Sequence, residues 1–382
     1  MIQTFPDLLL KRNKSEICKY LIPESLVMRH PLDKYTKSSD LYVIEGDRMK
    51  CLACGHKCKI AEGKRGICRV RFRQNNQLMV PFGYFGAVQC DPIEKKPFFH
   101  AFPNTLAMSF GMLGCDFHCD YCQNWDISQV MRDKRADRNP QKITIEEFIE
   151  HAKRLGARSV VSTYNEPLIT SEWATEIFKH AKNEGLATGY VSNGHGTSEV
   201  IEFLSSHLDM YKVDLKCFQE KGYRSLGGHL DAVLDTIKEI HRKGIWLEIV
   251  TLLVPDFNDS KEEITQIAEF IKSVSRDIPW HVTGFHPDYK MTDRHATSGK
   301  ALVDAVGIGQ EVGLNFVYAG NRPGSVGEFE STFCPKCGEL LVKRRSFQIL
   351  EYNLVKGNCP NCNISIPGLW EDPPKRDFQI LF

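Results

Sequence analysis

Three cysteines in the middle of the chain have the spacing of a metal-binding loop. Cys115, Cys119 and Cys122 form a C-x3-C-x2-C array within SFGMLGCDFHCDYCQNWDIS. Three thiolates can hold three irons of a 4Fe-4S cluster, because Cys thiolate is the usual ligand of cluster iron. No fourth Cys follows at ferredoxin spacing, so one iron would keep an open position where catalysis can occur. The alternatives are a three-Cys structural zinc site and plain buried thiols.

The residues around this array suit a cluster. Tyr121 stands just before the last Cys, where an aromatic ring could cover the cluster, and Gly111 and Gly114 would let the backbone fold closely around it. The array resembles the signature of the radical S-adenosylmethionine (SAM) superfamily, C-x3-C-x-aromatic-C. The resemblance implies a 4Fe-4S cluster that reductively cleaves SAM to methionine and a 5′-deoxyadenosyl radical, which abstracts hydrogen from a substrate.

Most of the 14 cysteines fall into three groups. In a cytoplasmic protein, grouped cysteines are more often metal ligands than disulfides. Cys18, Cys90 and Cys217 stand alone, and a lone Cys is usually a small core residue. Three groups predict three metal centres. Their members are Cys51, Cys54, Cys58 and Cys68; then Cys115, Cys119 and Cys122; then Cys334, Cys337, Cys359 and Cys362.

The last group has the pattern of a zinc ribbon. Its CPKC and CPNC knuckles, with Cys334, Cys337, Cys359 and Cys362, flank a β-rich stretch. Four thiolates make a closed tetrahedral site, which stabilises a fold too small for a large core. We therefore expect a structural or partner-binding zinc module after Gly324, with rubredoxin-like iron as the alternative.

The first group is also a four-Cys set, and the sequence leaves its metal open. Cys51, Cys54 and Cys58 come together on a tight loop, and the Gly63–Gly66 turn can return Cys68. The loop is short, charged and Lys-rich, which favours zinc, because cluster sulfurs more often lie under apolar cover. A second iron–sulfur cluster is the alternative.

The composition indicates a globular protein without a strong electrostatic field. The chain has 382 residues, 42% hydrophobic and 25% charged, and a formal net charge of +1. This balance gives no reason to expect a nucleic-acid partner. No apolar stretch reaches the length of about 18 residues that a membrane span requires, and the apolar core of MIQTFPDLLLKRNK is too short for a signal peptide. We expect a cytoplasmic protein with no nucleic-acid or membrane partner.

From Thr105 onward, strand-like and helix-like segments alternate. Such alternation implies parallel strands joined by right-handed crossovers, and roughly six or seven units make a full or partial β/α barrel. The expected fold class is α/β, a TIM-like barrel with small Cys-rich metal-binding modules at both ends. The expected strands are 105–110, 159–164, 187–192, 210–215, 245–254, 280–285 and 314–318, and the expected helices are 144–155, 172–183, 199–204, 230–242, 261–274 and 300–312.

These patterns divide the chain into four segments. We expect an N-terminal extension at 1–48, a Cys-knuckle module with a hairpin at 49–100, the barrel core at 101–322 and the zinc-ribbon-like module at 323–382. The hairpin should turn at Asn75-Asn76. Residues 90–100 contain two prolines and should be extended or turned rather than helical.

Polar side chains follow the predicted strands where they end. In a β/α barrel the carboxyl ends of the strands meet at one face, which holds the active site. At that face SAM would present an amine, a carboxylate, a ribose and an adenine. The candidates for SAM binding are Tyr121, Asn165, Glu166, Ser192, Asn193, Asp214, Lys216 and His286.

Each of these groups has an expected role. Glu166 or the neighbouring carbonyls should accept a hydrogen bond from the SAM amine, and Lys216 should form an ion pair with the SAM carboxylate. The Ser192-Asn193 pair suits the ribose, and His286 suits the ribose or the adenine. Asp214 should orient Lys216 or bind a cation.

The strand-end motifs resemble the pyruvate formate-lyase activating enzyme branch of the superfamily. They are YNEP at 164–167, SNG at 192–194, DLK at 214–216 and FHP at 285–287. Two positions depart from that branch: Val191 stands where those enzymes have a cation-binding Asp, and Glu248 lies among apolar residues where they have an Arg. More narrowly, residues 49–370 resemble the AmmeMemoRadiSam-system radical SAM proteins, through the segments 51–71, 91–100, 115–129 and 321–370.

The resemblance implies a radical SAM enzyme, oxidoreductase-like, with an unidentified small-molecule or protein substrate. A low-potential donor such as flavodoxin or ferredoxin would reduce its cluster. One alternative is a glycyl-radical enzyme activase. Another is a non-catalytic iron–sulfur electron carrier, which would need a fourth cluster ligand and would leave the strand-end groups without a purpose.

Overall fold

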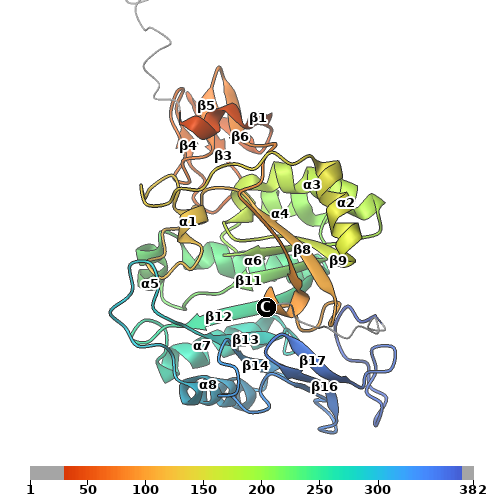
Figure 1. Cartoon of the computed structure of the whole chain (residues 1–382). Coiled ribbons are helices and arrows are strands. Elements are labelled where there is room, and N and C mark those ends of the chain that lie inside the picture. The colour runs from red at the N-terminus through yellow and green to blue at the C-terminus, as the bar shows by residue number, and fades with distance from the viewer. Residues whose placement is uncertain (1–29, 372–382) are drawn as a thin grey trace, which may run out of the picture.

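The core of the protein is one open, mostly parallel β-sheet. The computed structural model describes residues 30–371 and has at its centre an eight-stranded sheet of order β14-β13-β12-β11-β10-β9-β8-β7 (Figure 1). Strands β8 to β14 run parallel to one another, whereas β7 pairs antiparallel with β8. The strands are β7 Ala87–Pro92, β8 Leu106–Gly111, β9 Ala157–Ser162, β10 Ala187–Ser192, β11 Met210–Asp214, β12 Trp246–Leu253, β13 Trp280–Gly284 and β14 Val317–Gly320.

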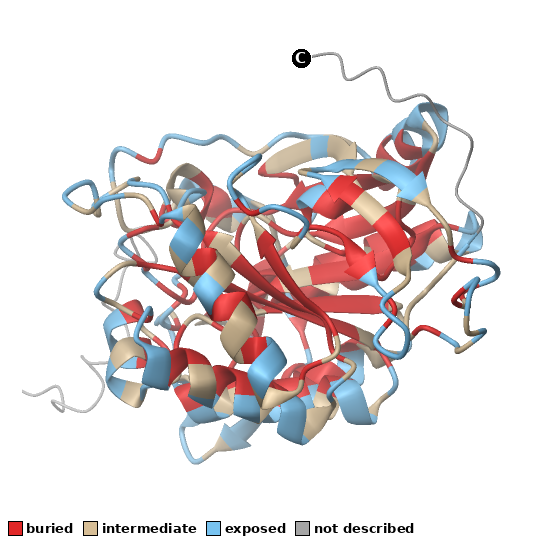
Figure 2. Cartoon of the chain, turned by 90° about the horizontal axis from the view of Figure 1, so that it is seen from below, coloured by how far each residue is buried: buried red, intermediate tan, exposed pale blue. Residues whose placement is uncertain are grey.

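Helices between successive strands cover the outside of the sheet. Figure 2 shows buried strands flanked by helices whose outward surfaces are exposed. The helices are α1 Trp125–Ser128, α2 Ile145–Leu155, α3 Ser171–Asn183, α4 Ser198–Ser205, α5 Glu220–Leu226, α6 Leu230–Arg242, α7 Lys261–Val274 and α8 Gly299–Val312, with 3-10 turns η2 Pro31–Lys34, η3 Ile93–Lys95 and η4 Pro167–Thr170.

Helix α2 shows how local sequence sets these elements. Oγ1 of Thr144 accepts from the backbone N–H of Glu147 at 3.1 Å, and the Glu147 carboxylate accepts from the Thr144 N–H at 2.8 Å. This reciprocal cap starts the helix, and Gly156, with φ of 69°, ends it in the left-handed region. Phe148 and Ile149 are buried on the face that packs against the sheet.

The sheet is open between its edge strands β7 and β14, so the predicted barrel is a partial one. The chain after β7 is anchored to the barrel strands through Glu248. The backbone N–H groups of Phe99 and His100 each donate to this carboxylate at 2.9 Å, and Nε2 of His281 lies 2.6 Å from it. A carboxylate at the centre of β12 is thereby buried with its hydrogen bonds satisfied.

Two small antiparallel sheets precede the core, at the top of Figure 1. Their orders are β1-β6-β5 and β2-β3-β4. Buried Arg71 joins them to α3 through a bidentate ion pair with Glu172 at 2.7 and 2.8 Å. The strands are β1 Thr36–Ser39, β2 Tyr42–Glu45, β3 Arg48–Cys51, β4 Lys59–Ile60, β5 Phe72–Gln74 and β6 Gln77–Pro81.

A third small sheet follows the core and lies beside β14 (Figure 1). It contains β15 Thr332–Phe333, β16 Leu340–Arg345 and β17 Gln348–Tyr352. Arg344 of β16 is buried and donates to the carbonyl of Phe99 at 2.8 Å. The hydroxyl of Tyr318 on β14 bonds both Thr332 at 2.8 Å and His100 at 2.6 Å. The C-terminal sheet therefore packs on the segment that follows β7, beside the open edge of the barrel.

Most expected elements agree with the structure. The predicted helices at 230–242 and 261–274 and the strand at 187–192 have the observed bounds, and the Asn75-Asn76 turn joins β5 to β6 with φ of 53° and 57°. Helix α5 was not predicted, and β14 begins three residues later than expected. Residues 1–29 of the expected N-terminal extension lie outside the described residues, and the domain limits stay predictions. No helix in the described range is long and apolar enough to cross a membrane.

Candidate active site

The loop after β8 brings three thiols to the wall of one cavity. Cys115, Cys119 and Cys122 all line a space of about 340 Å³ that reaches the ends of β9, β10 and β11. This volume lies within the usual range for small-molecule sites. The Cys loop and the strand ends therefore face the same space.

Two glycines let the loop pass close to its neighbours. A Cβ on Gly111 would lie only 2.4 Å from the carbonyl oxygen of Thr163, just after β9. Gly114 has φ of 99°, and a Cβ there would lie 2.8 Å from Cγ1 of Val70. The structure shows close backbone approach at both glycines toward Thr163 and Val70, and the expected folding of the loop around a cluster stays a prediction.

The three thiols are not gathered as closely as the ligands of a single zinc ion would be. Zn–S bonds of about 2.3 Å in a tetrahedron hold the sulfurs roughly 3.8 Å apart. In the described part of the chain, Cys115, Cys119 and Cys122 are not among the groups whose ligand atoms all lie within 4.8 Å of one another. Wider spacing fits a polynuclear cluster, in which each thiolate binds its own iron.

Polar groups surround the three sulfurs. The backbone N–H of Phe117 donates to Sγ of Cys115 at 3.4 Å, and Sγ of Cys122 lies 3.2 Å from Oγ of Ser128. Burial raises the pKa of the Cys119 thiol to about 12, whereas the Lys216 ammonium acts in the opposite direction. Such donors and a nearby cation favour the thiolate, which is the form that binds metal.

Glu166 joins the ends of β9 and β10. Its Oε1 accepts from Oγ of Ser192 at 2.7 Å and from the backbone N–H of Leu168 at 2.9 Å, and its Oε2 accepts from the N–H of Asn193 at 2.7 Å. Burial raises the pKa of Glu166 to about 8, and nearby Asp116 adds to the rise. Three of the predicted site residues thus form one connected group.

Asn165 connects β9 to the Cys loop. Its Oδ1 accepts from the backbone N–H of Met112 at 3.2 Å, and the N–H of Thr163 donates to the carbonyl of Phe110 at 2.8 Å. These bonds fix the start of the Cys loop against the end of the neighbouring strand.

Asp214 bridges two lysines at the end of β11. Its Oδ1 lies 2.5 Å from Nζ of Lys212 and its Oδ2 lies 3.6 Å from Nζ of Lys216. Burial works to lower the pKa of Lys216, but Asp214 and then Cys119 outweigh it and raise that pKa above its usual range. Lys216 is therefore a fixed positive charge on the cavity wall, paired with Asp214 as the sequence predicted. Lys212 was not predicted as a second partner.

The two remaining candidates lie at different depths. Tyr121 is buried on the cavity wall, with its ring centroid 6.0 Å from that of Phe257. The His286 side chain is 54% exposed and is not part of the cavity lining. Its Nδ1 lies 3.1 Å from Nε2 of Gln123, which does line the cavity. The structure thus brings every candidate except His286 to one cavity.

Comparisons with known proteins bear on this site. A family model described as the radical SAM superfamily matches residues 111–271, which contain the Cys loop and β9 to β12. The chain is also 35% identical over 327 residues to the uncharacterized protein MJ0808 of Methanocaldococcus jannaschii, covering 85% of this chain and 96% of that protein. The chain belongs to the radical SAM superfamily.

Within the radical SAM superfamily, the chain is also similar to pyruvate formate-lyase-activating enzymes. It is 27% identical over 195 residues to the pyruvate formate-lyase-activating enzyme of Clostridium pasteurianum, covering 48% of this chain and 81% of that enzyme. A solved domain of such an enzyme from Bacteroides vulgatus is 19% identical, with a TM-score of 0.38, and covers 43% of this chain and 99% of that domain. The narrower AmmeMemoRadiSam resemblance stays a prediction.

Sequence analysis missed a buried pair beside the radical SAM loop. Oδ1 of Asp116 accepts from Nδ2 of Asn193 at 2.9 Å, and Oδ2 of Asp116 lies 3.0 Å from Nδ1 of His195. Burial alone would raise the pKa of Asp116, but the bonds to His195 and Asn193 keep it below its usual value. The sequence offered one signal for this pair, which is that Asp116 directly follows a motif Cys and His195 directly follows the SNG motif.

The radical SAM cavity also extends to groups that sequence analysis did not single out. Glu94 lines it from the segment after β7, and Ser346 and Phe347 line it from the β16–β17 turn. Glu94 is buried, and burial raises its pKa to about 7. Its Oε1 accepts from the N–H of Asn104 at 2.7 Å, whereas its Oε2 is among the buried atoms with no hydrogen-bond partner in residues 30–371. This end of the cavity is lined by a buried carboxyl group, with one oxygen lacking a partner, and by an aromatic ring.

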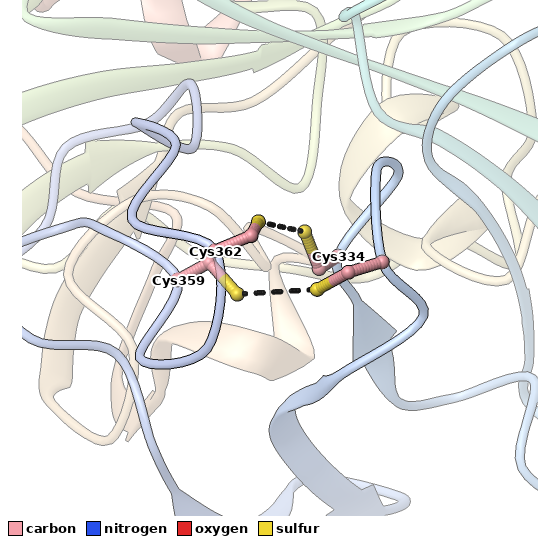
Figure 3. Close-up of side chains that lie close together, drawn as sticks. Cys334, Cys359 and Cys362 are labelled. Atoms are coloured by element: carbon pink, nitrogen blue, oxygen red, sulfur yellow. Dashed lines mark hydrogen bonds between the residues drawn. The ribbon is translucent and has the colours of Figure 1, made fainter.

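The C-terminal thiols converge on one point. Sγ of Cys334 lies 3.5 Å from Sγ of Cys362, and Sγ of Cys337 lies 3.6 Å from Sγ of Cys359; Figure 3 shows the two loops facing each other. All four sulfurs lie within 4.8 Å of one another. A tetrahedral zinc ion requires sulfurs roughly 3.8 Å apart, so this group fits a closed mononuclear site.

The N-terminal thiols lie on β3 and the turns that follow it. Cys51, Cys54 and Cys68 are buried, and Cys58 is half-buried. Sγ of Cys58 accepts from the backbone N–H of Ile67 at 3.4 Å. The four side chains lie between β3 and β5, and the expected Cys-knuckle module stays a prediction.

Proposed function

We propose that Cys115, Cys119 and Cys122 hold a 4Fe-4S cluster and that the strand ends of the partial barrel bind SAM. The observation that supports this most directly is that the three thiols and all the SAM candidates except His286 line one cavity. When bound, the cluster and SAM together supply reductive cleavage to methionine and a 5′-deoxyadenosyl radical that abstracts hydrogen from the substrate.

The chain's own charges would orient SAM in this cavity. Lys216 is held by Asp214 and lies close to the cluster thiols, so it is placed to pair with the SAM carboxylate. Oε2 of Glu166 accepts from the N–H of Asn193 and keeps a lone pair for the SAM amine.

Ser192 receives a positioning role in this proposal. Its hydroxyl donates to Glu166 at 2.7 Å and accepts from the backbone N–H of Gly194 at 3.0 Å. A hydroxyl with both bonds made inside the protein is poorly available to a ribose. The amide of Asn193 donates one N–H to Asp116 and accepts from the His195 N–H, but its second N–H remains for a ribose oxygen, and the residue lines the same cavity.

The substrate would occupy the end of the cavity lined by Glu94 and Phe347. Neither residue belongs to the SAM candidates, and Oε2 of Glu94 is a buried acceptor without a partner in the described range. A buried acceptor favours a ligand that donates a hydrogen bond, because an unsatisfied polar group in a dry site costs free energy. We therefore expect a substrate with at least one N–H or O–H group near its reacting carbon.

The test is anaerobic incubation of the reconstituted protein with SAM and dithionite. The proposal predicts that methionine and 5′-deoxyadenosine form in equal amounts and that neither forms without dithionite. An electron carrier would be reduced under the same conditions without any cleavage of SAM, and that result would overturn the proposal.

Glycyl-radical activation is the second candidate, because the detected relatives include pyruvate formate-lyase-activating enzymes. An activase abstracts hydrogen from a protein, whereas the cavity described here suits a small molecule. The two can be separated with a lysate of cells grown in deuterated medium, divided into protein and small-molecule fractions. Deuterium in 5′-deoxyadenosine from the protein fraction alone would favour the activase, and deuterium from the small-molecule fraction alone would exclude it.

A further inference from the structure

The N-terminal cysteines form a group whose spacing differs from that of the C-terminal site. The backbone N–H of Cys51 donates to the carbonyl of Cys58 at 3.0 Å, and the N–H of Ile67, next to Cys68, donates to Sγ of Cys58 at 3.4 Å, so the turns that carry these cysteines lie side by side. In residues 30–371, however, these four sulfurs are not one of the groups whose ligand atoms all lie within 4.8 Å. They are close together but too widely spaced for the roughly 3.8 Å of a tetrahedral zinc site.

This spacing has a precedent within the same chain. The cysteines of the radical SAM loop are likewise absent from the groups within 4.8 Å, whereas the C-terminal four are present. A cubane holds thiolates further apart than a single ion does, because each sulfur binds a different iron. Like the radical SAM loop, the N-terminal group is therefore more open than the zinc-type site.

The surroundings of the N-terminal thiols also differ from what the sequence suggested. Cys51 packs with Met49, Ile60, Leu78 and Val80 in one buried cluster. The lysines that made the loop seem polar, Lys57, Lys59 and Lys64, are all exposed. Cys68 packs with Val70 and Ile169 in a second buried cluster. The apolar cover that iron–sulfur clusters usually have is thus present, and the compositional reason for zinc does not apply.

A buried Asp–His pair links this group to the radical SAM loop. Sγ of Cys54 and one ligand atom each from Asp116 and His195 lie within 4.8 Å of one another, and all three residues are buried. On its other side, Asp116 approaches the radical SAM thiols, with Oδ1 3.8 Å from Sγ of Cys115. Nε2 of His195 is buried without a hydrogen-bond partner among the described residues.

We propose that Cys51, Cys54, Cys58 and Cys68 bind a second 4Fe-4S cluster, separated from the Cys115 site by the Asp116–His195 pair. The unpartnered Nε2 of His195 lies against Gly55, within the loop that carries Cys54 and Cys58. The carboxylate of Asp116 lies between Cys54 and Cys115. The four protein thiolates fill all four irons, so this cluster does not bind SAM.

The decisive variant is Cys115→Ala/Cys119→Ala/Cys122→Ala, because it removes the radical SAM site and leaves the N-terminal thiols intact. After anaerobic reconstitution it should retain about four irons and about four acid-labile sulfides per chain, against about eight of each in the wild type. Its reduced EPR signal should not shift when SAM is added. The Cys51→Ala/Cys68→Ala variant should also fall to about four irons, whereas Cys217→Ala, at a buried lone cysteine, should keep about eight.

Zinc in place of iron and sulfide in the triple variant would overturn the proposal. So would a wild-type protein with about four irons and two zinc ions per chain. Since the triple variant lacks the radical SAM ligands, it tests the second cluster whether or not the proposed SAM chemistry is correct. It also decides the question if Cys51→Ala/Cys68→Ala fails to fold.

Discussion

Oγ of Ser192 donates a hydrogen bond to Oε1 of Glu166 over 2.7 Å, which ties the end of β10 to the end of β9. The same carboxylate accepts from the backbone N–H of Asn193, so Glu166 sets the positions of both residues that follow β10. A change at Glu166 is therefore expected to act on SAM binding rather than on the cluster.

We predict that Glu166→Gln weakens SAM binding about tenfold or more while the iron content stays unchanged. A Gln amide has one acceptor oxygen, so its NH2 group would face either the Asn193 N–H or the donors to Oε1. The measurement is SAM affinity by equilibrium binding, with iron analysis on the same samples. Glu150→Gln, on the exposed face of α2, is the matched control, and equal SAM affinity in the two variants would contradict the prediction.

Lys216 and Lys212 share Asp214 as a partner, but they lie differently with respect to the cysteines of the radical SAM loop. Both bond Asp214, but only Lys216 lies on the side of Cys119 and Cys122. Lys216→Ala should weaken SAM binding by about tenfold or more, because it removes the counter-charge of the SAM carboxylate.

Lys238→Ala, at an exposed position on α6, is the control for Lys216→Ala and should leave SAM affinity unchanged. Lys216→Arg should recover part of the affinity, because it keeps the positive charge. If Lys216→Ala binds SAM as tightly as the control, the carboxylate contact is wrong.

Glu94 should make the stability of the protein depend on pH. Burial raises its pKa from 4.5 to about 7 in the folded protein, so the folded state holds this proton more tightly than the unfolded state. Stability from this group is therefore present at low pH and is lost as the pH rises from the unfolded pKa through the folded pKa.

The side chain of Gln is neutral at every pH, so Glu94→Gln should remove the loss of stability that Glu94 causes as the pH rises. Between about pH 5 and pH 8, the free energy of unfolding of Glu94→Gln should rise relative to wild type by about 2 kcal/mol. Urea unfolding at both pH values measures it, with Glu150→Gln as the control. If the free energies of unfolding of wild type and Glu94→Gln differ by the same amount at both pH values, Glu94 is not the group responsible for the pH dependence.

The C-terminal thiols should hold one zinc ion. Cys334→Ala/Cys337→Ala should lose that zinc, keep its iron and lower the melting temperature, because the site organises a small sheet that packs on Phe99 through Arg344. Metal analysis and thermal unfolding check this. Iron without sulfide in the wild type at this site, removed by the same double variant, would indicate a rubredoxin-like centre instead.

The barrel and most of its rim could be predicted because both follow local rules. Strands and helices alternate with clear periodicity, and the polar residues after each strand meet at one face once the strands are parallel. Glu166, Asn193 and Lys216 were found in this way. His286 obeys the same rule in the sequence, yet its side chain is largely exposed, because a position after a strand does not fix where the side chain points.

The features that sequence analysis missed depend on contacts between distant segments. Asp116 and His195 are 79 residues apart, and only the fold shows that they share a hydrogen bond. Glu94 and Phe347 reach the cavity from the two modules that flank the open edge of the sheet. The apolar cover of Cys51 was hidden because the loop's charged residues dominate its composition while their side chains point to solvent.

EPR of the reduced protein with and without SAM tests the central claim most directly. In the wild type, SAM should shift the signal of the cluster held by Cys115, Cys119 and Cys122, because the open iron gains a ligand, and 5′-deoxyadenosine should follow. Cys115→Ala/Cys119→Ala/Cys122→Ala should lose both the SAM-dependent shift and the 5′-deoxyadenosine. A triple variant that keeps either one would show that these cysteines are not the ligands of the catalytic cluster.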